Sequence, residues 1–466
     1  MAKAATTTIV TKPSPMRKLL PITSISLLVL AASCTVQEPA PFGVLPTKAQ
    51  VEWQKMEYTM FVHFGPNTFT GAEWGSGQEK AEIFNPTSLD CRQWAATAKA
   101  AGMKGIILTA KHHDGFCLWD CKYTKHTVMN SPHGKDIVKE TTKACRKHGI
   151  KFGVYLSPWD RNAPSYGDSP AYNKFFIEQL TELLSNYGEV HEVWFDGACG
   201  EGPNGKKQEY DWTAILAKIR ELQPKAVTAI MGDDVRWVGN EGGMGRDTEW
   251  SATAMAPGSY TEKNEAMAAL GIDNMSKDLG SRELIAKAQE AYWYPSEVDV
   301  SIRPGWFYHA DQDERVRSLA NLVNIYYRSV GCNSVLLLNI PPDRRGLIHE
   351  VDVQRIKELS NYISKTFANN YVENGNQLWV AETGQSKEYN VKPGTMVNTF
   401  LIQEDITQGQ RVEDFLVEVY SNGAWQYAAE GTTVGYKRLL RFSDCQPEKI
   451  RVTIRATRAT ANITNI

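Results

Sequence analysis

Short apolar strands alternate with helical segments between about residue 50 and residue 360, and this alternation constrains the fold more than any other feature. Each strand is a continuous apolar run, which is typical of a parallel sheet covered by helices. The expected strands are 58–63, 105–110, 151–157, 192–196, 226–231, 298–302 and 335–340; the expected helices are 91–101, 136–148, 174–187, 213–222 and 313–330. These units predict an α/β fold with a (β/α)8-like barrel. A long stretch at 232–292 leaves room for irregularity in its second half, and we expect it to carry functional loops.

The chain changes character after Lys365. Alternating strands are expected at 399–404, 412–421, 425–430, 437–442 and 449–456, without a long helix between them. We therefore predict a barrel domain over residues 48–365 and an antiparallel β-sandwich over residues 366–466. We expect the sandwich to brace the barrel, with carbohydrate binding by the sandwich itself as the alternative.

The first 34 residues have the pattern of an export signal. Arg17 and Lys18 precede an apolar stretch, 19–30, that is too short to span a bilayer, and small residues then lead to Cys34. This segment resembles a bacterial lipoprotein signal, with an ordinary secretory signal as the alternative. We expect an exported protein, periplasmic or anchored to the outer membrane, whose membrane contact would be a lipid on Cys34.

The remaining cysteines and the overall charge argue against a disulfide-rich domain, a zinc-binding domain and a nucleic-acid-binding protein. The seven cysteines after Cys34 are odd in number and lack the spacing of a disulfide-rich or zinc-binding domain, so we expect free thiols. The formal net charge is −2, which gives no polybasic surface for nucleic acid.

The run His191–Gly197 carries the clearest chemical signal. Val193, Trp194 and Phe195 form an apolar strand that ends in Asp196, and Gly197 follows at once. Catalytic groups of such barrels lie where strands end, at the carboxyl-terminal face. Asp196 is therefore a candidate reactive acid, and capping of the following turn is the alternative.

Polar and aromatic residues follow the other predicted strands as well. They are His63, Glu73, Trp74, His112, His113, Asp114, Tyr155, Trp194, Arg236, Glu241 and Trp306. Donors, acceptors and flat apolar rings together suit a hydroxyl-rich ligand. His63, His112 and Asp114 could instead hold a metal, but neighbouring residues on a strand point to opposite faces, so we favour hydrogen bonding to ligand hydroxyls.

Four blocks of this sequence resemble a known family. Phe61–Gly65, Glu73-Trp74, Lys111–Phe116 and Val193–Gly197 are similar, in order and in strand position, to the signature blocks of the α-L-fucosidases of glycoside hydrolase family 29. The resemblance covers about residues 50–360, and the tail is similar to that family's C-terminal sandwich. It implies that Asp196 is the nucleophile. It implies fucose-binding roles for His63, Glu73, Trp74, His112, His113, Tyr155 and Trp194.

The general acid/base is assigned from a further resemblance. The block Val235–Glu241 is similar to one found in the subgroup selective for α-1,3 and α-1,4 fucosyl branches, which implies Glu241. Glu297 is the second choice, although it could pair with Arg303, and Glu249 is the third. We expect Arg236 to help keep Asp196 ionised and Trp306 to pack on the apolar edge of the sugar.

These assignments predict hydrolysis of terminal α-L-fucose from a fucosylated glycan, without a cofactor or metal. A retaining glycosidase holds its two carboxyl groups about 5–5.5 Å apart and reacts by double displacement through a covalent glycosyl-enzyme. Two alternatives remain: a catalytically silent, surface-anchored glycan-binding lipoprotein, and a metal-dependent hydrolase that uses His63, His112 and Asp114.

Overall fold

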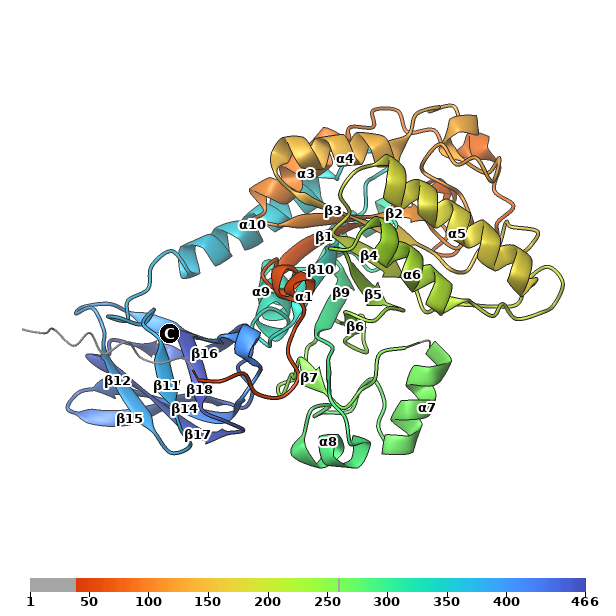
Figure 1. Ribbon diagram of the computed structural model, residues 1–466. Coiled ribbons are helices and arrows are strands. Elements are labelled where there is room, and N and C mark those ends of the chain that lie inside the picture. Colours follow the sequence, from red (N-terminus) through yellow and green to blue (C-terminus); the bar gives the residue numbers. More distant parts are fainter. Residues whose placement is uncertain (1–38, 259) are drawn as a thin grey trace, which may run out of the picture. The chain divides into compact units, whose positions relative to one another are not determined.

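A parallel, nearly closed barrel forms the centre of the computed structural model, which describes residues 39–258 and 260–466 (Figure 1). Its strands are β1 (Tyr58–Val62), β2 (Gly105–Lys111), β3 (Lys151–Leu156), β4 (Glu192–Phe195), β5 (Val227–Ile230), β6 (Arg236–Trp237), β9 (Ser296–Ser301) and β10 (Val335–Asn339). They run in the order β5-β4-β3-β2-β1-β10-β9-β6. A parallel bridge between Ala229 and Val235 links β5 to β6, and the predicted barrel is confirmed. The predicted signal segment 1–34, with Cys34, lies outside the described residues.

The barrel is irregular where β5 passes to β6. Residues 231–235 make this connection without a helix, and the backbone N–H of Ile230 donates to the carbonyl of Val235. Ile230 has φ of 68°, a strained conformation for a β-branched residue. The stretch after β6 then forms β7 (Ala252–Thr253), α7 (Tyr260–Leu270), α8 (Arg282–Ala288) and β8 (Tyr292–Trp293).

Helices surround the barrel strands in Figure 1. They are α1 (Lys48–Gln54), α2 (Pro66–Thr70), α3 (Cys91–Ala100), α4 (Ile137–His148), α5 (Ser169–Asn186), α6 (Trp212–Leu222), α9 (Leu319–Arg328) and α10 (Glu350–Thr366). The single helix predicted over 313–330 is wrong in its first part. Ala310–Arg315 is a separate 3₁₀ helix, and α9 begins after Ser318, whose hydroxyl accepts from the N–H of Asn321.

Alternating side chains of each barrel strand point inward and outward. On β4, Val193 and Phe195 pack in the core between sheet and helices, whereas Trp194 belongs to the cluster inside the barrel. Asp196 follows Trp194 by two residues and therefore continues the inward-facing row. The strand pattern thus aims this carboxylate at the mouth of the barrel.

The C-terminal strands form two four-stranded antiparallel sheets, as predicted. Their orders are β11-β18-β13-β16 and β12-β17-β14-β15. The strands are β11 (Trp379–Ala381), β12 (Ser386–Asn390), β13 (Val397–Glu404), β14 (Val412–Ser421), β15 (Ala424–Gly431), β16 (Arg438–Cys445), β17 (Lys449–Thr457) and β18 (Ala461–Asn465). Phe400, Phe415 and Val452 are among the buried residues of their shared core. The short strands β11, β12 and β18 were not predicted.

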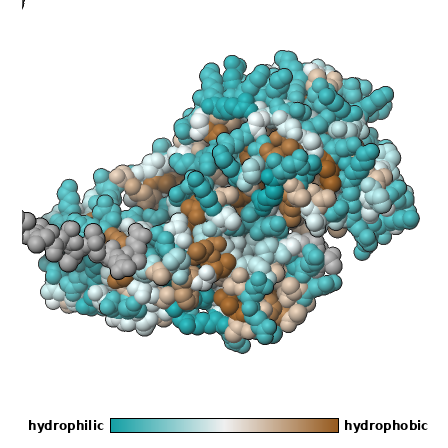
Figure 2. All heavy atoms as spheres, in the orientation of Figure 1, coloured by the Kyte–Doolittle hydropathy of each residue, from teal (hydrophilic) through white to brown (hydrophobic). Residues whose placement is uncertain are grey.

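The surface shown in Figure 2 is mostly hydrophilic, with hydrophobic residues in small separate groups. Within residues 39–258 and 260–466, no helix is both long enough and apolar enough to cross a membrane. The seven cysteines from Cys91 to Cys445 carry free thiols, as predicted.

Candidate active site

A cavity of about 320 Å³ lies at the carboxyl ends of the barrel strands. Nine of the predicted site residues line it: His63, Trp74, His112, His113, Trp194, Asp196, Arg236, Glu241 and Trp306. Trp194 lies on β4 and Arg236 on β6, and the others lie in the segments that follow β1, β2, β4, β6 and β9. The barrel therefore brings together residues that lie more than two hundred positions apart in the sequence.

Two hydrogen bonds fix the carboxylate of Asp196. Its Oδ1 accepts from the backbone N–H of Ala198 at 2.7 Å, and its Oδ2 accepts from the hydroxyl of Tyr155 at 3.0 Å. The Nε2 atom of His113 lies 3.8 Å from Oδ2. The side chain stays 28% exposed, so it remains accessible to a ligand in the cavity.

Hydrogen bonds also determine which nitrogen of His63 carries a proton. Its Nδ1 lies 2.8 Å from Oδ1 of Asn339, an acceptor, so Nδ1 is the protonated nitrogen. The amide of Asn339 is oriented by its Nδ2, which donates to the carbonyl of Trp306 at 2.8 Å. Burial lowers the pKa of His63 to about 3. The ring is therefore neutral, and its Nε2 can accept a hydrogen bond from a ligand hydroxyl.

His113, like His63, carries its proton on Nδ1. The hydroxyl of Ser157 donates to the carbonyl of Trp159, so it can only accept from Nδ1–H of His113, at 2.7 Å. Burial lowers the pKa of His113, against the effect of the nearby Asp196. Burial likewise lowers the pKa of His112, whose ring stacks on Tyr155 at 5.7 Å. The cavity thus holds three neutral imidazoles.

Glu241 lies at the rim of the cavity, where the residue as a whole is exposed but its carboxyl is half-buried and forms a side-chain hydrogen bond with Trp306. Burial of its carboxyl raises the pKa of Glu241, the Trp306 hydrogen bond opposes this, and the charge of Asp196 raises it further. Glu241 is therefore protonated at a higher pH than an ordinary glutamate.

Glu73 and Glu297 do not line this cavity in the described part of the chain. Glu73 accepts from the backbone N–H of Trp306 at 2.7 Å and contacts Nε2 of His309 at 2.7 Å. It therefore orders the loop that carries Trp306.

Glu297 lies inside the barrel, fully buried, where its Oε2 accepts from the indole of Trp194 at 2.9 Å. The alternative left open from the sequence, a pairing of Glu297 with Arg303, is not found in the described chain. Arg303 binds Asp352 at 2.8 Å and Asp313 at 2.9 Å instead, because its guanidinium points away from the barrel interior toward α10.

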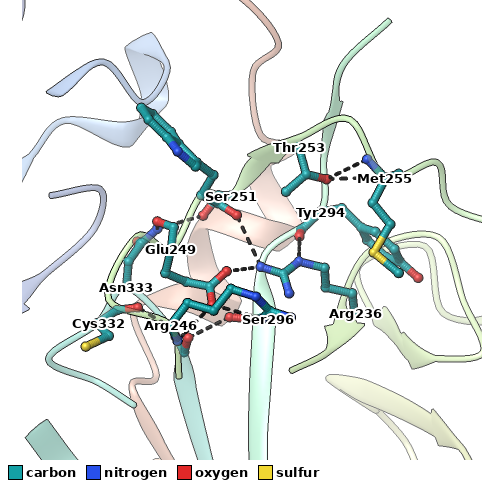
Figure 3. A network of polar contacts seen from close by, with 12 residues as sticks. Arg236, Arg246, Glu249, Ser251, Thr253, Met255, Tyr294, Ser296, Cys332 and Asn333 are labelled. Carbon is teal, nitrogen blue, oxygen red and sulfur yellow. Dashed lines mark hydrogen bonds and ion pairs between the residues drawn. The ribbon is translucent and has the colours of Figure 1, made fainter. Parts of the chain in front are cut away.

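Arg236 and Glu249 belong to a buried network (Figure 3). The guanidinium of Arg236 binds Glu249 and donates through Nε to the carbonyl of Tyr294 at 2.9 Å. Arg236 is thus held by Glu249, and its hydrogen bonds are not to Asp196. Its Nη1 is buried and, among the described residues, has no hydrogen-bond partner.

The β-sandwich supports this network. Gln410 donates to the carbonyl of Glu249 at 3.0 Å, and the hydroxyl of Thr433 accepts from the N–H of Glu249 at 2.9 Å. These contacts fit the predicted bracing role of the sandwich.

Glu249→Leu should lower the free energy of unfolding by about 3–5 kcal/mol, because it leaves the buried guanidinium of Arg236 without its counter-charge. Urea denaturation measures this. Glu52→Leu, which breaks an exposed pair with Lys55, is the matched control and should cost less than about 1 kcal/mol. Equal effects for the two variants would contradict the importance of the network.

Several lining residues were not predicted. Asp299 on β9 accepts from the indole of Trp237 at 2.8 Å, and burial, helped by the charges of Glu241 and Asp196, raises its pKa to about 7. Trp237 belongs to β6, and the others come mainly from the stretch after it: Met255, Lys263, Asn264, Met267 and Asn274. Asp299 lies within β9 and not at its end, so the pattern of a strand ending in an acid does not identify it, and α7 gives no such signal either.

One group of side chains in residues 39–258 and 260–466 has the arrangement of a possible metal site. Asp343, His349 and Glu350 place ligand atoms within 4.8 Å of one another, outside the cavity. His63, His112 and Asp114 do not form such a group in the described chain, because Asp114 turns back to accept from the N–H of Phe116 at 2.7 Å.

Of the three carboxylic acids that line the cavity in the described chain, Asp299 is buried, whereas Asp196 and Glu241 are accessible beside neutral imidazoles and aromatic rings. Cleavage of a glycosidic bond uses such a pair, and the class of protein is a glycoside hydrolase.

Comparison with known proteins identifies the family. The family model described as alpha-L-fucosidase matches residues 42–367. Alpha-L-fucosidase 1 of Arabidopsis thaliana is 40% identical over 455 residues, which are 90% of this chain and 86% of that protein. The chain belongs to the alpha-L-fucosidase family.

Solved structures agree with this. A Bacteroides ovatus protein described as a candidate alpha-L-fucosidase is 59% identical, with a TM-score of 0.88 over 90% of this chain and 73% of that chain. A Ruminococcus gnavus GH29 fucosidase in complex with fucose is 30% identical, with a TM-score of 0.80 over 92% of this chain and 95% of that chain. Family membership favours a fucosidase over a silent glycan-binding protein or a metal-dependent hydrolase.

Proposed function

We propose that this chain is a retaining, exo-acting α-L-fucosidase in which Asp196 is the nucleophile and Glu241 is the general acid/base. The observation that carries the proposal is the contrast between these two acids within one cavity. Asp196 is held by two donors, whereas burial and the charge of Asp196 raise the pKa of Glu241. One acid is arranged to attack and the other to deliver a proton.

The reaction proceeds in two displacements. In the first, a carboxylate oxygen of Asp196 bonds to the anomeric carbon while the bond to the leaving oxygen breaks, and Glu241 transfers its proton to that oxygen. In the second, Glu241 removes a proton from water, the water oxygen bonds to the anomeric carbon, and the ester to Asp196 breaks. Esterification removes the charge of Asp196, which favours the deprotonated form that Glu241 needs as a base.

The walls of the cavity suit a terminal fucose. Nε2 of the neutral His63 and His113 can accept from sugar hydroxyls, and the ring of Trp306 can cover an apolar edge. The volume of about 320 Å³ is near the lower end of the range for ligand sites, which suits one terminal sugar with part of its neighbour.

Trp306→Phe should shift the alkaline limb of the kcat/KM profile to higher pH by up to about one unit. The indole hydrogen bond stabilises ionised Glu241, so its loss raises the pKa of Glu241 further while the aromatic ring is kept. The pH dependence of aryl fucoside hydrolysis measures the shift. An unmoved alkaline limb would mean that Glu241 does not control it.

We further propose selectivity for α-1,3- and α-1,4-linked fucose. Support comes from the block Val235–Glu241, which is similar to a block of the subgroup with this selectivity. Glu241 of this block lines the cavity, whereas Glu73 and Glu297 do not in the described chain. Free fucose should be released from trisaccharides with α-1,3 or α-1,4 branches and at least about tenfold more slowly from an α-1,2-linked one. Equal rates on all three would refute the selectivity.

We also propose that residues 1–34 direct export and that Cys34 receives the lipid anchor, on the basis of the sequence pattern. Cys34→Ser should abolish incorporation of labelled fatty acid and release the protein from the membrane fraction. Unchanged labelling would exclude Cys34 as the anchor.

A further inference from the structure

Two glutamates meet inside the barrel, below the cavity. Glu192 is the first residue of β4 and Glu297 the second residue of β9, strands that are not neighbours in the sheet. Both side chains are at most 1% exposed. They form a side-chain hydrogen bond with each other.

Each carboxyl is also held by a tryptophan. Glu192 Oε2 accepts from the indole of Trp53 at 3.0 Å, and Glu297 Oε2 accepts from the indole of Trp194 at 2.9 Å. Within the described chain, Oε1 of each glutamate is buried and finds no N–H or hydroxyl donor. Two ionised carboxylates can only accept, so the contact between them requires a proton on one of them.

Trp194 connects this pair to the reacting groups. Its ring lines the cavity and stacks on Tyr155, with centroids 5.1 Å apart and planes inclined by 22°. Tyr155 in turn donates to Asp196 at 3.0 Å. The orientation of the Trp194 indole is therefore set from below by Glu297 and transmitted above to the carboxylate of Asp196.

We propose that Glu297, sharing a proton with Glu192, is a positioning residue that fixes Trp194 and, through Tyr155, Asp196. This inference rests on the proposed function, because it assigns a role in the same reaction. It gives Glu297 a function without contact with the substrate, in place of the acid/base role considered from the sequence.

Glu297→Leu and Glu297→Gln distinguish this role from simple packing. Leucine removes the acceptor for the Trp194 indole, so kcat/KM for an aryl fucoside should fall by about tenfold to a hundredfold. Glutamine keeps an oxygen for Trp194 and offers an N–H to Glu192, so it should restore kcat/KM to within about threefold of the wild type near pH 6.

Glu182→Leu is a matched control. Glu182 is a buried glutamate that accepts from the indole of Trp119 at 3.0 Å, and neither residue lines the cavity. The same kind of hydrogen bond is lost, so the melting temperature should fall while kcat/KM stays unchanged. If Glu297→Leu folds and keeps wild-type kcat/KM, the positioning role is wrong.

The shared proton has its own test, which also applies if Glu297→Leu fails to fold. Burial raises the pKa of both glutamates, and the charges of Glu192 and of Asp299 on β9 raise the pKa of Glu297 further. The folded chain therefore binds the proton more tightly than the unfolded chain, so stability decreases as pH rises above the ordinary glutamate pKa. Glu297→Gln replaces the proton by an amide N–H, and its melting temperature should fall less between pH 5 and pH 8.

Failure of the proposed function and failure of the proton-sharing pair give different results. A wild-type protein that releases no fucose overturns the proposed function. An active wild type in which Glu297→Gln is as impaired as Glu297→Leu, or has the same pH dependence of melting as the wild type, overturns the proton-sharing pair.

Discussion

Asp196→Ala should reduce turnover of an aryl fucoside on the order of 10⁴- to 10⁶-fold, because it removes the carboxylate that forms the ester at the anomeric carbon. The structure predicts that the protein still folds, since Asp196 lies at the end of β4 and is partly exposed. Steady-state kinetics and circular dichroism measure the two effects. Azide should restore activity and give the β-fucosyl azide, because a small anion can then attack in a single displacement.

Asp196→Asn is the matched control for this variant. It keeps the shape of the side chain and one oxygen acceptor, for either Tyr155 or the N–H of Ala198, but it has no anionic nucleophile. It should be as inactive as the alanine variant. If Asp196→Asn retains more than about a tenth of wild-type turnover, Asp196 positions other groups and does not attack.

Glu241→Ala should lower kcat/KM for an oligosaccharide by about 10²- to 10⁴-fold, because its poor leaving group needs a proton. Aryl fucosides with acidic phenols should lose less in the first step. Azide should then accelerate breakdown of the glycosyl-enzyme, because it attacks the anomeric carbon as the ester to Asp196 breaks, and the product should be the α-fucosyl azide. The anomer of the azide product is determined by NMR.

Two other glutamates serve as controls for this assignment. Glu73→Ala disturbs the loop of Trp306 and Glu297→Ala disturbs Trp194, so both should be impaired without rescue by azide. Rescue of Glu297→Ala, with no rescue of Glu241→Ala, would show that the acid/base is Glu297.

The positions where the barrel strands end were predictable, because each is marked by residues that are adjacent in the sequence. An apolar run such as Val193–Phe195 needs burial on both sides, so the polar residue that follows it must lie at the edge of the sheet. The sandwich strands were predictable for a similar reason, since β14 and β17 alternate buried and partly exposed residues along their length.

The barrel interior was not predictable from these patterns. Glu297 and Asp299 alternate with Val298 and Val300, which indicates a strand with one face in solvent. In the structure this polar face is buried, because indole N–H groups from Trp194 and Trp237 satisfy the carboxyls. These indoles come from segments that are distant in the sequence, so the residues around Glu297 and Asp299 do not indicate them.

The loops after β6 were predicted to be functional, but their individual residues were not. Lys263 and Asn264 line the cavity because α7 packs beside the mouth of the barrel, a tertiary arrangement that helical periodicity does not reveal. Likewise, β6 has two residues and is recognised as a strand through its pairing with β9.

Mass spectrometry of the Glu241→Ala variant, quenched during turnover of an aryl fucoside, tests the central claim most directly. With a good leaving group the ester forms, and without the general base it is hydrolysed slowly, so it should accumulate. We expect a mass increase of one deoxyhexosyl unit on the peptide that contains Asp196. A deoxyhexosyl adduct on another residue, or inversion of the anomeric configuration by the wild-type enzyme, would contradict the account.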